Sequence, residues 1–196
     1  MYKRQVLTRS DVVLKMAYIA WMTNDIRLRE ELCTYLPALE SYNRASYIGI
    51  VLARTESKVE QEYVLQSLGD RSADIRDEAY KVLSEMSLSP EQYQHIEELL
   101  RFKYSEMRIN AINLLMKQPE AQLAASIRRL LSDKNAERRL AGLDMMKSIR
   151  NVDFLKDSYQ KLLSTVREIQ KPNAKEKILI ESLIGDGTEQ SPTSNY

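Results

Sequence analysis

The residues of this sequence that could do acid–base chemistry are few, and they begin with a single histidine. His95 follows Glu91 by four residues and precedes Glu98 by three, so on a helix the three side chains share one side. A histidine beside carboxylates could act as a general base, but that role also requires a nucleophile or a substrate pocket. The sequence supplies neither of them. We therefore expect His95 at the surface or at the boundary of the core.

Cys33 and Trp21 are the other singular residues of the chain. Cys33 lies in the segment ELCTYL on an apolar helical stripe, which favours a small buried hydrophobe. With one thiol and one histidine, neither an internal disulfide nor a zinc site is expected. Trp21 lies near Tyr18 and Met22, and we expect it to pack in the core of the first helix, with an exposed docking surface as the alternative.

Known catalytic motifs are also missing from the sequence, which has no P-loop, no zinc-protease histidine pair and no serine-hydrolase elbow. We therefore predict a protein that is not an enzyme and that holds no cofactor and no metal.

The composition indicates a folded, helical and cytoplasmic protein. Of the 196 residues, 43% are hydrophobic and 29% charged, which excludes a chain disordered along its whole length. Glycine and proline number five each, too few for the turns of a small β-sandwich. The net charge of +1 gives no general attraction to nucleic acid or anionic lipid. The longest apolar run, residues 12–22, contains Lys15 and falls short of the roughly 20 residues of a membrane helix. No secretory signal precedes it.

Three segments of the sequence repeat the same pattern around an arginine. Arg76, Arg108 and Arg139 are spaced by 32 and 31 residues. Each follows an acidic residue by two positions, precedes a small residue by three and precedes a large apolar residue by seven. A weaker fourth copy surrounds Arg44. A second ladder with nearly the same period consists of leucines: Leu36, Leu68, Leu100, Leu131 and Leu163. Two ladders in one register indicate a structural repeat.

Each period contains two amphipathic segments of helical periodicity, separated by short links that contain Gly, Pro, Ser or Asp. This pattern predicts an all-α fold, an α-solenoid of about ten helices in antiparallel pairs with a period near 32 residues. The predicted organisation is an N-terminal capping helix in residues 1–24, a repeat array in 25–184 and a flexible tail in 185–196. Residues 10–22 match the second helix of a pair whose first helix is missing.

Asp70 with Arg76, and Asp133 with Arg139, carry a resemblance to a known family. Each aspartate precedes its arginine by six residues, which resembles the short bacterial HEAT and HEAT-like repeats over residues 25–165. The resemblance implies that each arginine bonds the aspartate of a neighbouring repeat and that these bonds fix the turns. We expect Asp70 and Asp133 to act in this way through Arg76, Arg139 or Arg108, so that Asp133 pairs with Arg139 or Arg108. Phe102 stands where the next aspartate is expected, and Ala38 replaces it in the first copy, so the ladder is interrupted there.

The resemblance favours a non-enzymatic scaffold that binds a protein or peptide, with membership of a larger bacterial protein left open. In stacked arrays the outward side of the second helices usually forms the binding surface. The expected partner-binding residues on that side are Lys81, Glu85, Asn113, Lys117, Asp144 and Lys147. The alternative is a nucleic-acid-binding or DNA-repair protein like the alkylpurine glycosylases, which the single tryptophan and balanced charge disfavour. A lyase of the phycobiliprotein type shares the fold, but no residue supports it.

Overall fold

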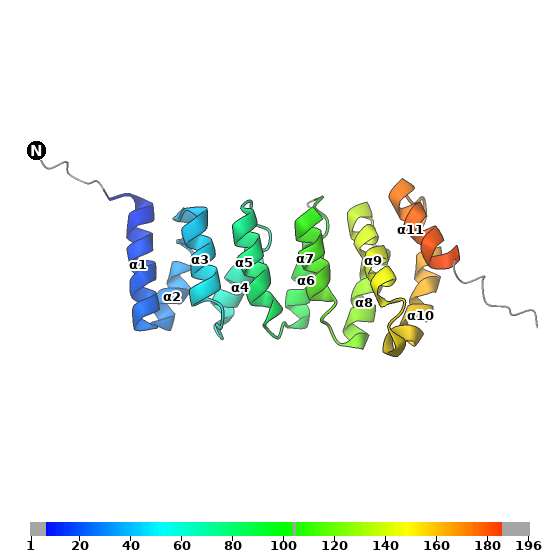
Figure 1. Cartoon of the computed structure of the whole chain (residues 1–196), viewed down its shortest axis with the longest axis horizontal. Coiled ribbons are helices and arrows are strands. Elements are labelled where there is room, and N and C mark those ends of the chain that lie inside the picture. Colours follow the sequence, from blue (N-terminus) through cyan, green and yellow to red (C-terminus); the bar gives the residue numbers. More distant parts are fainter. Residues whose placement is uncertain (1–6, 104, 186–196) are drawn as a thin grey trace, which may run out of the picture. The chain divides into compact units, whose positions relative to one another are not determined.

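The computed structural model of the chain describes residues 7–103 and 105–185 (Figure 1). These residues form eleven α-helices and two short 3-10 helices, and no strand occurs among them. Helices that follow one another in the chain pack in neighbouring pairs. The predicted all-α fold of paired helices is thereby confirmed. The chain forms two compact units, Met1–Ser89 and Pro90–Tyr196.

The first unit contains five α-helices and one 3-10 helix. The helix predicted at residues 10–22 is α1, and it packs against α2 and α3. The α3 helix packs against α5, and α4 packs against both α2 and α5. The bounds of these elements are α1 Arg9–Thr23, α2 Ile26–Leu32, η1 Leu36–Ala38, α3 Ser41–Val51, α4 Lys58–Ser67 and α5 Ala73–Ser84.

The second unit contains six α-helices and one 3-10 helix. The first helices of the pairs are α6, α8 and α10, and they pack on one another in that order. The second helices, α7, α9 and α11, do the same. The bounds are α6 Pro90–Leu99, α7 Ser105–Leu115, α8 Glu120–Leu131, α9 Ala136–Ile149, η2 Asp153–Leu155, α10 Lys156–Arg167 and α11 Ala174–Gly185. Of the flexible tail predicted in residues 185–196, Gly185 is the last residue of α11, and residues 186–196 lie outside the described part of the chain.

Polar side chains fix where the helices begin. Thr8 and Asp11 form a capping box at α1, in which each side chain bonds the backbone N–H of the other residue. Asp25 and Asn135 each accept two backbone N–H groups at the starts of α2 and α9. These bonds satisfy donors that a helix start leaves open, so the links between helices remain short.

The leucine ladder forms the centre of the core. Leu36, Leu68, Leu100 and Leu131 are at most 3% exposed, as the period predicts. Leu163, the last member, is only half-buried. No further first helix covers this side of α10 among the described residues, which is the physical reason for the difference.

A small residue in the second helix allows its first helix to approach closely. A Cβ added to Gly142 of α9 would lie 3.1 Å from Cβ of Leu130 and from Cδ2 of Leu131 in α8. Ala79 and Ala111 hold the same position in α5 and α7 and are 0% and 2% exposed. Gly142 therefore shows the predicted role of the small residue most clearly, because the approach of α8 leaves little room for a side chain there.

The arginines of the ladder do not bind the carboxylates of the aspartates six residues before them. Nη1 of Arg76 donates to the backbone oxygen of Asp70 at 3.0 Å, and Nη1 of Arg139 donates to that of Asp133 at 2.9 Å. The Asp70 carboxylate instead accepts from Arg44, the arginine one repeat earlier. The bond between neighbouring repeats is thus present, as Arg44 with Asp70. The bond between an arginine and the carboxylate six residues before it is absent.

Asp133 has a different partner from the two that the sequence predicts, Arg139 and Arg108. Its Oδ2 lies 3.0 Å from Nη1 of Arg138, and its Oδ1 accepts the backbone N–H of Asn135 at 2.7 Å. The predicted pairing is wrong because Nε of Arg139 is directed to Glu176, 2.7 Å away. The side chain of Arg108 is directed to Glu137 and Asp144 of α9.

We expect a double-mutant cycle to detect this partner. The pair Asp133→Asn and Arg138→Gln should show an interaction of about 0.5–1 kcal/mol in urea unfolding, since both side chains are partly exposed. The cycle of Asp133→Asn with Arg108→Gln should be additive, because the structure separates these side chains. Coupling in the second cycle and none in the first would contradict the observed geometry.

Candidate functional site

The six residues expected to bind a partner lie at the surface and are divided between the two units. Lys81 and Glu85 belong to the first unit, where the Lys81 ammonium lies 2.7 Å from Oε1 of Glu78. The other four, Asn113, Lys117, Asp144 and Lys147, belong to the second unit. All except Asp144, which is half-buried, are exposed. Their outward orientation agrees with the prediction, and their role in binding stays a prediction.

Asp144 is a member of this row that lines a hollow. Its Oδ2 accepts a hydrogen bond of 2.5 Å from Nη2 of Arg108. Nη1 of the same arginine lies 3.5 Å from Oε2 of Glu137. This ion-paired group borders a hollow of about 420 Å³ between α7, α9 and α11. The apolar part of its lining comes from Phe102, Leu140, Ile178 and Leu179. The arginine already has two carboxylate partners, so this hollow offers an external ligand mainly apolar surface.

The outer side of α1 carries the densest group of exposed apolar side chains in the first unit. We define the α1 face as Tyr18, Ile19, Trp21 and Met22, which are 59%, 51%, 49% and 62% exposed. The inner side of the same helix is also apolar, through Val13, Ala17 and Ala20. The expectation that Trp21 packs in the core is therefore wrong, and the alternative of an exposed surface agrees with its position.

The register of the repeat explains why the α1 face is uncovered. The positions two periods after Tyr18 and Ile19 are Val82 and Leu83 of α5, which are 4% and 0% exposed, whereas Ile50 of α3, one period after Tyr18, is 65% exposed. The helix α4 packs alongside α5. Among the described residues, no first helix takes the position beside α1 that α4 takes beside α5. A helix that is apolar on all sides is usually buried, so the α1 face has the character of a contact surface.

A shallow hollow continues the α1 face toward α3. It measures about 170 Å³ and includes Leu14 and Trp21 of α1 with Ser46, Ile50 and Val51 of α3. Ile50 is 65% exposed. The Tyr18 and Trp21 rings meet edge to face, with centroids 6.0 Å apart. The two aromatic rings therefore form one rim of an apolar groove between two second helices.

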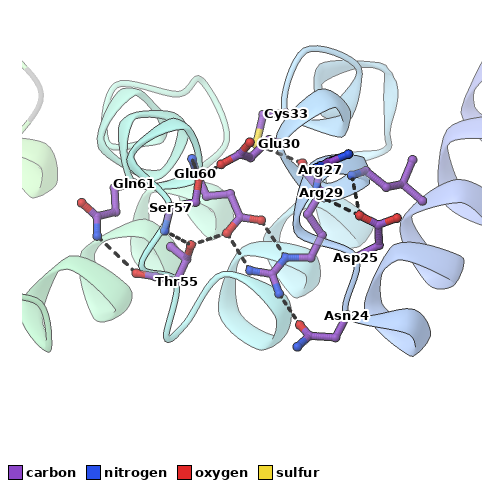
Figure 2. A network of polar contacts seen from close by, with 11 residues as sticks. Asn24, Asp25, Arg27, Arg29, Glu30, Cys33, Thr55, Ser57, Glu60 and Gln61 are labelled. Atoms are coloured by element: carbon purple, nitrogen blue, oxygen red, sulfur yellow. Dashed lines mark hydrogen bonds and ion pairs between the residues drawn. The ribbon is translucent and has the colours of Figure 1, made fainter.

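A buried ion pair lies inside the first unit and joins two first helices (Figure 2). The Glu60 carboxylate of α4 is 0% exposed. Both of its oxygens accept from Arg29 of α2, Oε1 from Nε and Oε2 from Nη2, each at 2.7 Å. Arg29 also donates to Asn24 at 2.6 Å. Such a two-bond guanidinium–carboxylate pair fixes the register between the two helices.

Hydroxyl groups complete the surroundings of Glu60. Thr55 donates to its Oε2, and the Thr55 hydroxyl oxygen accepts the backbone N–H of Ser57 at 3.1 Å. The Ser57 hydroxyl caps α4 and donates to Oε1 of Glu30 in α2 at 2.5 Å. Every polar group in this network serves helix starts or helix contacts (Figure 2). We therefore assign it to stability and not to catalysis.

Cys33 lies beside this network and is 8% exposed. Burial, reinforced by the negative charges of Glu60 and Glu30, raises the pKa of its thiol to about 12. The same two causes, burial and the Glu60 charge, raise the pKa of the Tyr47 phenol to about 12. Both groups are therefore protonated at neutral pH, and neither is a ready nucleophile. The prediction of Cys33 as a small buried hydrophobe agrees with its position.

We expect the Cys33 thiol to resist alkylation in the folded protein. At pH 8 the thiolate fraction of a group with a pKa near 12 is negligible, whereas an unfolded thiol with a pKa of about 8.5 ionises in part. Iodoacetamide should label Cys33 slowly in buffer and rapidly in urea, as measured by mass spectrometry. Equal labelling rates in the two conditions would contradict the burial of this residue.

A second buried pair joins first helices in the other unit. Glu97 of α6 is 2% exposed and accepts from Nε and Nη2 of Arg129 in α8, at 3.1 and 2.6 Å. In the same unit the fully buried Glu176 of α11 accepts from Arg139 of α9. Sequence reasoning missed these carboxylates. The available signals were the spacings of 31 and 32 residues within the pairs Arg29–Glu60 and Glu97–Arg129, close to the repeat period.

Paired helices of a common period, stacked through apolar ladders and Arg–Glu bonds, define an all-α helical-repeat protein. His95 of α6 is half-buried at the boundary of the core, as expected. Within residues 7–103 and 105–185, no three acidic, His or Cys side chains are grouped to hold a metal ion. None of the helices described has the length and apolar character that crossing a bilayer requires.

The chain belongs to a family of unknown function, DUF5724, whose model matches residues 2–196. No curated protein matches the sequence. Among solved structures, the chain is similar to the archaeal HEAT-like repeats protein from Thermococcus onnurineus NA1. The identity is 16% and the TM-score 0.44, over 96% of this chain and 93% of that chain.

Proposed function

We propose that this protein is a non-enzymatic interaction module that binds a partner protein through the α1 face. The observation that carries the proposal is the exposure of Tyr18, Ile19, Trp21 and Met22 on a helix whose opposite side is also apolar. Aromatic and Met side chains are enriched at the centres of protein interfaces. The adjoining hollow toward α3 adds a groove that suits the apolar side of a helix.

The buried groups support a structural protein in preference to an enzyme. The ion pairs of Glu60, Glu97 and Glu176 each join neighbouring helices, and the Cys33 thiol is protonated. Scaffold binding of a protein or peptide accounts for the exposed groups without requiring a reaction.

Affinity capture from cells of the source organism tests the proposal. The wild type, a Trp21→Ser and Met22→Ser double variant and a Val59→Ser control would serve as baits. Val59 is 49% exposed on α4 and lies outside the α1 face. We expect the wild type and the control to retain the same proteins and the double variant to lose them. Identical retention by all three baits would overturn the proposal, provided that circular dichroism shows each variant to be folded.

The single tryptophan gives a direct second measurement. Binding of a purified captured protein should shift the Trp21 emission to shorter wavelength, because the half-exposed ring becomes buried. A titration with duplex DNA at low salt separates this function from the nucleic-acid alternative. Salt-sensitive DNA binding without any protein partner would favour that alternative.

A further inference from the structure

A basic hollow lies in the second unit, between the end of α9, one side of α10 and the end of α11. It measures about 600 Å³, a size typical of ligand sites. Three of its lining side chains are cationic, Arg150, Lys156 and Arg167. Asp153 is the one acidic residue in the lining. The hollow therefore carries a net positive charge.

One face of α10 contributes both charge and apolar surface to this hollow. Lys156, Gln160, Leu163 and Arg167 line it and recur at the spacing of a single helix face. Leu163 belongs to the leucine ladder, whose preceding member Leu131 is 1% exposed in α8, where α10 packs alongside. The face of α10 around Leu163 thus continues the surface by which first helices pack on one another.

The ion pairs inside the protein indicate that this face of α10 lacks partner carboxylates. Arg29, Arg129 and Arg139 each cross to a neighbouring helix and bind a buried glutamate there. Among the described residues, Lys156 and Arg167 have no carboxylate within ion-pairing distance. Their charges are complementary to an acidic helix that packs beside α10 as α10 itself packs beside α8.

We propose that this basic hollow binds an acidic amphipathic helix of a partner protein. Apolar residues of that helix cover the half-buried Leu163 and Ile184, and its glutamates or aspartates approach Lys156 and Arg167. The inference rests on the proposed interaction function and adds a second surface with a partner of defined charge. It concerns only the second unit and is independent of the α1 face.

A labelled synthetic peptide tests the proposal by fluorescence anisotropy. The probe is a helical peptide with leucines along one stripe and glutamates on both flanks, compared with the same peptide carrying glutamine for glutamate. We expect the full chain to bind the glutamate peptide about tenfold more tightly, from a few partly exposed charge pairs. The Lys156→Glu and Arg167→Glu double variant should lose this preference.

Matched variants assign the result to this surface. Lys161→Glu changes an exposed charge of α10 outside the hollow and should keep the preference. Equal binding of the two peptides by the wild type, or equal loss in Lys161→Glu and the double variant, would overturn the proposal. The Trp21→Ser and Met22→Ser variant should bind the peptide normally, so a failure at the α1 face and a failure here are distinguishable.

The segment 186–196 of the chain is the competing occupant, because it contains Asp186 and Glu189 and no basic residue. In the full chain, Asp186→Asn with Glu189→Gln should leave the peptide affinity unchanged if the occupant comes from a partner. Binding that becomes about tenfold tighter would show that this segment fills the hollow and would overturn the proposal.

Discussion

Replacement of Arg29 by methionine should destabilise the first unit by about 3–5 kcal/mol. The substitution leaves the Glu60 carboxylate without its guanidinium partner in a site that is 0% exposed, and an uncompensated buried charge carries a penalty of that size. Urea unfolding followed by the fluorescence of Trp21 measures the loss, since the single tryptophan lies in the same unit.

Two further variants separate the buried charge from other effects. Arg27→Met changes an exposed arginine of the same helix and should alter stability by less than about 0.5 kcal/mol. Adding Glu60→Gln to Arg29→Met removes the unpaired charge and should recover part of the stability. Similar losses for Arg29→Met and Arg27→Met would show that the pair contributes little.

The second large effect is expected from Leu115→Ala in α7. Leu115 is 0% exposed, and its truncation leaves a cavity that costs about 2–5 kcal/mol in cores of this kind. Far-UV circular dichroism in urea measures the change, because the second unit contains no tryptophan.

Ile109→Ala provides the control for this cavity. Ile109 lies on the same helix and is 58% exposed, so its truncation should change stability by less than about 0.5 kcal/mol. An unfolding midpoint for Leu115→Ala that matches the wild type would mean that the α7 core tolerates the loss by collapsing. That outcome would contradict the close packing of Leu115 in the core.

The repeat could be predicted from the sequence because it rests on local periodicity. Leu83, Leu115 and Leu131, predicted to be buried, are 0%, 0% and 1% exposed. Apolar residues at helical spacing identify an inner face without knowledge of what covers it. The same argument located α1 within one residue at each end, Arg9–Thr23 against the predicted 10–22.

The errors concern what lies beside a helix, which periodicity does not report. Trp21 is on an apolar helix, yet no described helix covers it, so its ring is half-exposed. Asp133 pairs with Arg138 and not with Arg139, because the direction of a long side chain depends on the neighbouring helix. Glu60 is fully buried in a helix with many polar residues, and its contacts with Arg29 and Thr55 explain that position.

The arginine bonds of the second helices have a direction along the chain. Arg108 of α7 contacts Glu137 of α9, and Arg139 of α9 contacts Glu176 of α11. The helix α9 therefore accepts through one glutamate and donates through one arginine two residues later. The same spacing of acid and arginine occurs in α5, as Asp74 and Arg76, and in α7, as Glu106 and Arg108, whereas α11 has Ile178 two residues after Glu176. Duplication or loss of a whole period would preserve the spacing between acid and arginine, whereas insertion of a few residues between them would change it.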